Sequence, residues 1–285
     1  MIEFIQFLTE DNVKTEGFIN KTGSKKIIIS VHGMTSNGFK KRNYKLYEEA
    51  EKQGIDLMAF NNRGTGLANL YSKGDDRVFG GTSYEDPRES YLDIKAAIEE
   101  SLRRGYEEIY LLGHSLGSTK VLYTYLRLKE ENYEHLGNIK KLILLALVDI
   151  GAMVRALKDN LEKFVDISKE MIDSGNGLDF MPKGAFIYPV SANTFYVYAK
   201  NYKDFNFVNY EEEYDFEKIN SVDIPIMVMW GEFDKYIEKQ GAYNLKKTLE
   251  EKIPGIDARV IPGTDHSYHG AEDIMTEEVL DFINK

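Results

Sequence analysis

The chain contains no cysteine. This absence excludes a disulfide framework, a thiolate nucleophile, and zinc or iron–sulfur sites that are held by thiolates. Covalent catalysis, if the protein performs it, would therefore use serine, threonine, lysine or a carboxylate. A chain without thiols also fits a reducing compartment.

Positive charge and long apolar runs are scarce as well. The 36 Lys and Arg residues against 47 Asp and Glu give a net charge of −11, which argues against binding to nucleic acid or to an anionic membrane surface. The longest apolar run, residues 142–148, is far shorter than the about 20 residues of a membrane-spanning helix. The first residues, MIEFIQFLTEDN, lack the basic start of a signal peptide. We therefore expect a cytoplasmic protein without a nucleic-acid or membrane partner.

What the chain does contain is the alternation of an α/β protein. Residues 26–31 and 109–112 are short apolar runs typical of strands buried on both faces. Asp86 and Pro87 mark the start of a helix whose apolar residues recur every three or four positions. Strands that alternate with helices in this way predict a mostly parallel central sheet with helices on both faces.

The alternation stops near residue 150 and resumes with an apolar run at residues 224–230. We therefore predict one α/β core, residues 1–149 and 222–285, with an inserted helical segment, residues 150–221. Residues 61–81 are rich in Gly and Asn and are expected to form a long loop.

The sequence Gly113-His114-Ser115-Leu116-Gly117 is a GxSxG motif between a predicted strand and a predicted helix. A sharp strand-to-helix turn exposes the central serine at the end of the sheet, and the glycines allow close packing. A Gly-rich turn with a helix-capping serine is the alternative interpretation.

With this motif as its nucleophile elbow, the chain resembles the α/β-hydrolase superfamily over nearly its whole length. Three further segments carry the resemblance, and they are Ser30-Val31-His32-Gly33-Met34, Trp230-Gly231-Glu232-Phe233-Asp234 and Gly263-Thr264-Asp265-His266. In that family the corresponding segments carry the oxyanion loop, the catalytic acid and the catalytic histidine. The resemblance implies the α/β-hydrolase fold, a serine hydrolase, and a cap formed by residues 150–221.

A serine nucleophile needs a base within hydrogen-bonding reach, and the chain has five histidines. The resemblance assigns this role to His266, and His269 is the second choice. His114 is expected to pack within the elbow, and His32 to order the oxyanion loop. His135 lies in a polar stretch and is expected to be solvated.

The base in turn needs a carboxylate that orients it. Asp234 gives the chain order Ser, Asp, His of this fold, whereas Glu232 and Asp149 remain alternatives. Asp265 is expected to stabilise its own turn, and Asp223 precedes its strand at the opposite end of the sheet.

Backbone N–H groups are the expected oxyanion donors. The residue after the nucleophile, Leu116, supplies one, and the resemblance assigns the other to Met34. We predict no cofactor and no metal, because the pair His266 and His269 lacks further ligands at suitable spacing.

The predicted cap is rich in aromatic residues, with twelve between residues 180 and 216. They either line a site for an apolar or aromatic acyl group or form the small core of the cap itself. An acidic run follows at Glu211, Glu212, Glu213, Asp215 and Glu217, and it would disfavour anionic substrates if it bordered the cleft.

The loop around Arg63, with Gly80 to Tyr84, loosely resembles uncharacterised α/β hydrolases related to fungal siderophore esterases, and Arg63 is expected to bridge loop carbonyls. The resulting prediction is a carboxylesterase that cleaves a small to medium, aromatic or hydroxamate-linked acyl ester through Ser115, His266 and Asp234. An acyltransferase, a thioesterase, a peptidase and a non-catalytic ligand receptor on this fold are the alternatives. Monomer and homodimer both stay open.

Overall fold

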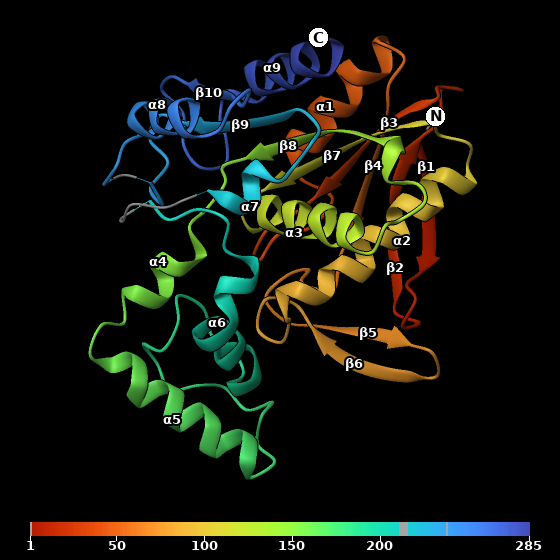
Figure 1. Cartoon of the computed structure of the whole chain (residues 1–285). Coiled ribbons are helices and arrows are strands. Elements are labelled where there is room, and N and C mark those ends of the chain that lie inside the picture. Colours follow the sequence, from red (N-terminus) through yellow and green to blue (C-terminus); the bar gives the residue numbers. More distant parts are fainter. Residues whose placement is uncertain (1, 211–215, 238) are drawn as a thin grey trace.

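An eight-stranded sheet forms the centre of the computed structural model, which describes residues 2–210, 216–237 and 239–285 (Figure 1). Its strands are β1 (Ile2–Leu8), β2 (Lys14–Asn20), β3 (Lys26–Val31), β4 (Asp56–Asn61), β7 (Glu108–His114), β8 (Ile139–Leu145), β9 (Ile226–Gly231) and β10 (Asp257–Ile261). Their order in the sheet is β1-β2-β4-β3-β7-β8-β9-β10. The strands from β4 to β10 are parallel, and β1 and β2 add an antiparallel edge.

Helices cover both faces of this sheet. They are α1 (Lys41–Lys52), α2 (Ser90–Arg103), α3 (Leu116–Glu130), α8 (Ala242–Lys252) and α9 (Glu272–Asn284). Successive residues of β3 point to opposite faces, so Ile27 and Ile29 pack in the core under α2, α3 and α8, while Ile28 packs in the core under α1 and α9. A β-branched run buried on both sides is what the sequence predicted for this strand, and the mostly parallel sheet is confirmed.

The prediction of a long loop at residues 61–81 is wrong. A hairpin of β5 (Asn69–Lys73) and β6 (Asp76–Gly80) lies there, and its turn residues are Gly74 and Asp75. Gly74 has φ 58°, as the tight hairpin turn requires. The hairpin lies outside the main sheet and leaves Leu70 and Phe79 exposed, so the half-buried alternation that marks a strand in a sequence is weak in it.

Residues 150–221, the predicted cap, contain α4 (Ile150–Arg155), α5 (Asn160–Asp173), α6 (Ala192–Phe205) and α7 (Glu217–Asn220). Figure 1 shows α4, α5 and α6 gathered at one end of the molecule, away from α1 and α9. A hydrophobic cluster that includes Val165 and Phe195 joins α5 to α6. A second cluster, with Tyr198 and Phe205 of α6, packs on Leu116 at the start of α3. No helix in the described residues is long and apolar enough to cross a membrane.

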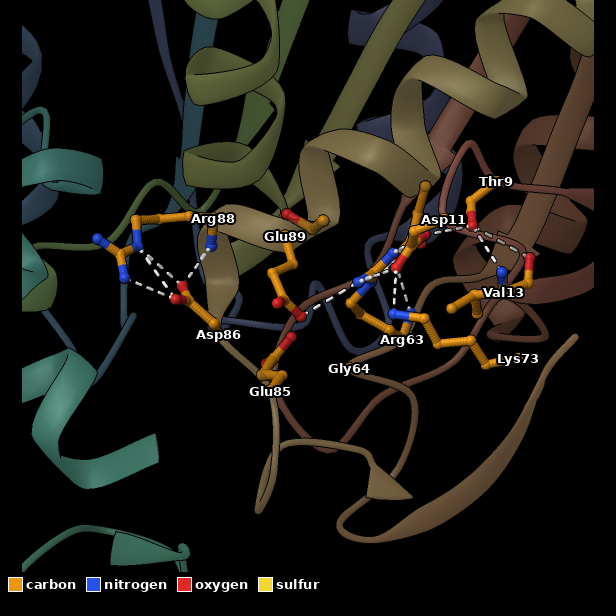
Figure 2. Close-up of polar contacts among 12 residues, drawn as sticks. Thr9, Asp11, Val13, Arg63, Gly64, Lys73, Glu85, Asp86, Arg88 and Glu89 are labelled. Carbon is orange, nitrogen blue, oxygen red and sulfur yellow. Dashed lines mark hydrogen bonds and ion pairs between the residues drawn. The ribbon is translucent and has the colours of Figure 1, made fainter. Parts of the chain in front are cut away.

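Arg63 ties the loop after β4 to α2 and to the β1–β2 turn. Its guanidinium is within 3.1 Å of carboxylate oxygens of Asp93, Asp11 and Glu89, and Figure 2 shows Arg63 and Lys73 converging on Asp11. The expectation that Arg63 bridges loop carbonyls is therefore wrong in its partners, which are carboxylates. Because Asp93 is fully buried, its charge requires this counter-ion.

Replacing Arg63 with methionine is expected to lower the free energy of unfolding by about 3–5 kcal/mol, because the buried Asp93 would lose its counter-ion. Urea denaturation followed by circular dichroism measures this loss. The control is Lys52→Met, which removes an exposed ion pair with Glu49 and should change stability by about 0.5 kcal/mol or less. A loss in Arg63→Met no larger than in the control would contradict the prediction.

Candidate active site

Ser115 occupies the turn between β7 and α3. Its backbone has φ 58° and ψ −126°, a conformation that non-glycine residues rarely adopt. The turn is held by the Ser115 N–H, which donates to the carbonyl of Leu145 on the neighbouring strand at 2.8 Å. The Ser118 hydroxyl is 2.8 Å from the same carbonyl and 2.9 Å from that of Gly113. The predicted motif thus forms a sharp strand-to-helix turn with the serine at its apex.

The two glycines of the motif are required by close packing. A Cβ on Gly117 would lie 2.2 Å from the carbonyl oxygen of Val31, and one on Gly113 would lie 2.3 Å from that of Gly117. Both obstacles are backbone atoms, which cannot move aside as a flexible side chain could. Any larger residue would therefore push the turn away from the sheet.

His266 and Asp234 are brought together from loops 32 residues apart. The Nδ1 atom of His266 donates to Oδ2 of Asp234 at 2.7 Å, and Oδ1 of Asp234 accepts from the N–H of Tyr236 at 2.9 Å. The Asp234 side chain is 1% exposed. Because the carboxylate holds the proton on Nδ1, the Nε2 atom of His266 is left as the basic nitrogen.

The His266 ring is positioned by aromatic neighbours and by its own backbone. Tyr236 packs edge-on against it with ring centroids 4.5 Å apart, and His114 does so at 5.1 Å. Nε2 of His114 also lies 2.8 Å from the carbonyl oxygen of His266. His114 therefore packs within the turn, as the sequence predicted, and additionally anchors the loop that carries His266.

Ser115 and His266 line one cavity of about 500 Å³. Within the described residues the Ser115 hydroxyl has no hydrogen-bond partner. Ser115 and His266 therefore border the same cavity without being hydrogen-bonded to each other. The cavity is also lined by the oxyanion loop, the start of α1, the loop after β9 and part of the predicted cap, through Met34, Lys40, Arg42, Phe233, Tyr236, Met153, Ile187 and Tyr188.

The two predicted oxyanion donors border this cavity. Leu116 is the first residue of α3, so its N–H has no acceptor within the helix. No described residue accepts a hydrogen bond from the N–H of Met34 either. A Cβ on Gly33 would lie 2.9 Å from Cβ of Ser115 and 3.1 Å from the nitrogen of Leu116. Only glycine therefore allows the two loops to approach so closely.

The predicted oxyanion loop is held by residues that follow β4 and β6. His32 lies 2.7 Å from the Thr65 hydroxyl through Nε2 and 3.0 Å from the carbonyl of Gly33 through Nδ1. The Thr35 N–H donates to the Thr82 hydroxyl at 2.7 Å. Burial, with a smaller effect from the charge of Lys120, lowers the pKa of His32 to about 3. His32 is therefore a neutral positioning residue, consistent with its predicted role.

The alternative acids have other partners. Asp149 caps α4, forms a 2.6 Å ion pair with Arg155 and accepts from the N–H of Tyr210. Glu232 accepts from the N–H of Gly263 at 2.8 Å.

The two remaining carboxylates from the sequence analysis also lie where they were expected. Asp223 pairs with Lys129 at the far end of the sheet. Asp265 pairs with the exposed His269 at 2.7 Å and accepts from the N–H of Ser267, which stabilises its own turn. The described residues contain no group of three or more side chains arranged to hold a metal ion.

Most of the described aromatic residues of the predicted cap pack away from the cavity, but they are divided among several hydrophobic clusters. Of the described members of the aromatic-rich segment, Tyr188 lines the cavity. Phe195 lies in the core of the cap, and Tyr198 and Phe205 lie at its junction with α3. Phe207, Tyr210 and Phe216 pack in the main core beside the sheet instead, so neither interpretation accounts for the whole segment. The acidic run falls largely outside the described residues, because residues 211–215 are not among them.

Several residues of the site were not singled out from the sequence. Tyr236 packs on His266, and Thr82 holds the oxyanion loop. Lys40 and Arg42 line the cavity at the start of α1. The available signal was the basic run Lys40-Lys41-Arg42, which follows the oxyanion loop closely in an acidic chain.

Comparisons with known proteins identify the fold and a family. The model of a family described as "Protein of unknown function (DUF1749)" matches residues 80–284. No curated protein matches the chain.

Three similar solved structures confirm the α/β-hydrolase fold. Est1E of Butyrivibrio proteoclasticus with ferulic acid bound has a TM-score of 0.65 and 17% identity over 98% of both chains. The Pyrococcus furiosus esterase Pf2001 has a TM-score of 0.62 and 18% identity over 100% of this chain and 91% of its own. The α/β hydrolase GrgF of Penicillium sp. sh18 has a TM-score of 0.70 and 13% identity over 99% and 97%.

Acid is expected to destabilise the protein through its buried histidines. Burial lowers the pKa of both His32 and His114 from the ordinary value of 6.5, so below that pH the unfolded chain binds protons that the folded chain does not. The free energy of unfolding should therefore fall as the pH drops from about 6.5 towards 3. Each histidine accounts for a loss of about 1.4 kcal/mol between about pH 7.5 and about pH 5.5.

Urea denaturation at the two pH values measures this loss. His32→Gln should make stability less dependent on pH, whereas His135→Gln, which alters an exposed histidine, serves as the control. Equal stability of the wild type at both pH values would contradict the prediction.

Proposed function

The chain belongs to the family described as "Protein of unknown function (DUF1749)", and from its own site we propose that it is a serine hydrolase that cleaves carboxylic esters. The observation that carries the proposal is the 2.7 Å bond between His266 and the buried Asp234, in a site where His266 and Ser115 border one cavity. A serine held in strained geometry beside an oriented histidine is the arrangement that nucleophilic acyl transfer needs.

In the first half-reaction Ser115 Oγ attacks the ester carbonyl while Nε2 of His266 takes the hydroxyl proton. Asp234 stabilises the imidazolium that forms, since it is already hydrogen-bonded to Nδ1. The N–H groups of Met34 and Leu116 stabilise the oxyanion of the tetrahedral intermediate. The intermediate collapses to an acyl-enzyme, and His266 returns the proton to the departing alcohol.

In the second half-reaction water takes the place of the alcohol. His266 removes a proton from water, which attacks the acyl carbon and releases the acid and the free Ser115 hydroxyl. Transfer to another alcohol, a thiol or an amine would use the same acyl-enzyme. Two similar structures support ester chemistry, since Pf2001 is an esterase and Est1E holds ferulic acid.

The cavity supports a small to medium substrate. Its volume of about 500 Å³ is within the range of small-molecule sites, which is about 300–1,000 Å³. Residues 150–221 act as the cap in this proposal, because Met153, Ile187 and Tyr188 form part of the cavity wall. Tyr188 and Tyr236 line the same cavity, so the predicted cap and the loop of Asp234 both border it.

Ser115→Ala is expected to abolish hydrolysis of 4-nitrophenyl acetate and butyrate, with kcat/KM falling by roughly four or more orders of magnitude. A fluorophosphonate probe should label the wild type on Ser115 and leave the variant unlabelled, as read by mass spectrometry of the tryptic peptide. Unchanged circular dichroism would show that the variant is folded. Retained activity in a folded Ser115→Ala protein would overturn the proposed function.

Asp234→Asn is expected to lower kcat by roughly four orders of magnitude, because an amide no longer holds the proton on Nδ1 of His266. Glu232→Gln, two residues away in the same loop, is the matched control and should retain activity. Asp149→Asn tests the other acid position. A larger loss in a folded Asp149→Asn protein than in Asp234→Asn would show that the acid is assigned wrongly.

A further inference from the structure

Arg42 is a buried cation without a counter-ion at the cavity. It is the second residue of α1, is 7% exposed, and borders the same cavity as Ser115. No described residue forms an ion pair or a hydrogen bond with its guanidinium. Its Nε atom is buried and has no hydrogen-bond partner. A buried guanidinium without a counter-ion destabilises the ligand-free protein, and a bound anion would remove that free-energy penalty.

The other buried Lys and Arg side chains among the described residues are paired. Arg63 contacts Asp93 and Asp11, and Lys120 contacts Glu85. The need for a counter-ion is therefore met inside the fold at the two positions that lie away from the cavity. At Arg42 it is not met.

The groups near Arg42 cannot neutralise it. The charge of Arg42 acts on His32, His114 and Tyr268, which places its guanidinium beside the oxyanion loop and the elbow. Burial lowers the pKa of both histidines and raises that of Tyr268, so all three are neutral. Burial also lowers the pKa of Arg42 to about 10, which still leaves it fully charged at neutral pH.

Cations outnumber carboxylates in the rest of the cavity wall. Lys40 and Lys235 line it, and no described carboxylate pairs with either. The two acidic residues of the wall are already paired, Glu272 with Lys41 at 2.9 Å and Asp265 with His269. The start of α1 adds to this potential, because its first turn has no acidic residue and no side chain caps it.

We propose that the substrate is an anionic ester, whose carboxylate or phosphate oxygens pair with the Arg42 guanidinium while Ser115 attacks the ester carbonyl. The inference rests on the proposed function, because it assigns the substrate class of that same site. The two Nη groups of a guanidinium donate side by side and can bind two oxyanion oxygens. Hydrolysis adds water across the ester bond, and the products are an alcohol and an acid, one of which keeps the second anionic group.

This substrate class differs from the apolar or aromatic acyl ester that the sequence favoured. The acidic run that argued against anionic substrates lies largely outside the described residues. The described wall of the cavity carries unpaired cations instead, in a chain whose net charge is −11.

The test compares matched charged and neutral esters. One pair is 4-nitrophenyl hemiadipate and its methyl ester, with the charge on the acyl side, and the other is 4-acetoxybenzoate and its methyl ester, with the charge on the alcohol side. In at least one pair the wild type should favour the charged ester by kcat/KM. Arg42→Met should reduce that charged-to-neutral ratio by roughly 10- to 100-fold, mainly through KM, and Arg42→Lys should restore part of it.

The matched control is Lys45→Met, which removes a partly exposed cation one turn further along α1 and should keep the wild-type ratio. A wild type that does not prefer the charged ester in either pair would overturn the proposal, and so would an unchanged ratio in Arg42→Met. Both results would leave Ser115-dependent hydrolysis, and hence the proposed function, in place.

A binding measurement separates the two proposals further. In the Ser115→Ala protein, adipate or inorganic phosphate should raise Tm, and the additional change Arg42→Met should remove that shift. The relative effects of adipate and phosphate distinguish a carboxylate site from a phosphate site. Equal shifts with and without Arg42 would contradict anion binding at this position, whatever the outcome of the hydrolysis assays.

Discussion

The close approach of three backbone segments at the Ser115 turn is the constraint on which the rest of the site depends. The end of β3, the β7–α3 turn and the end of β8 meet there with no room for a Cβ on Gly33, Gly113 or Gly117. The contact holds Ser115 at its positive φ and puts the N–H of Leu116 next to the oxyanion loop. The proposed nucleophile and oxyanion donors are thereby positioned by the ends of strands in the buried central sheet.

The buried histidines beside Ser115 are neutral, whereas two buried cations elsewhere in the fold are charged and paired. His32 and His114 are buried and neutral beside the elbow, so they shape loops without adding charge to the reacting atoms. The buried charges of Arg63 and Lys120 are matched by carboxylates within the fold. Arg42 differs from Arg63 and Lys120 because no described carboxylate pairs with it. Since it borders the cavity, we infer that the substrate supplies the missing negative charge.

The fold was largely predictable from the sequence, because buried parallel strands and capped helices carry strong local patterns. Apolar runs in the sequence coincide with β3, β7, β8 and β9. The pair Asp86-Pro87 coincides with the start of the helical segment that leads into α2. The β5–β6 hairpin was missed because it packs outside the main sheet and keeps apolar residues exposed. The partners of Arg63 were misjudged because Asp11 and Asp93 are distant in the sequence and meet it only in the folded chain.

The sequence pattern by itself determined the mostly parallel α/β core, because buried strands and amphipathic helices have local signatures, and the resemblance to α/β hydrolases supplied the candidates Ser115, Asp234 and His266. The tertiary structure alone decided which carboxylate reaches His266, since Asp234, Glu232 and Asp149 are all acids and differ only in what lies beside them. It also decided that the aromatic residues of the predicted cap are divided among three hydrophobic clusters and that Arg42 is buried with no hydrogen-bond partner for its Nε among the described residues. Pairing and burial are relations between distant segments, and a linear pattern of residues does not contain them.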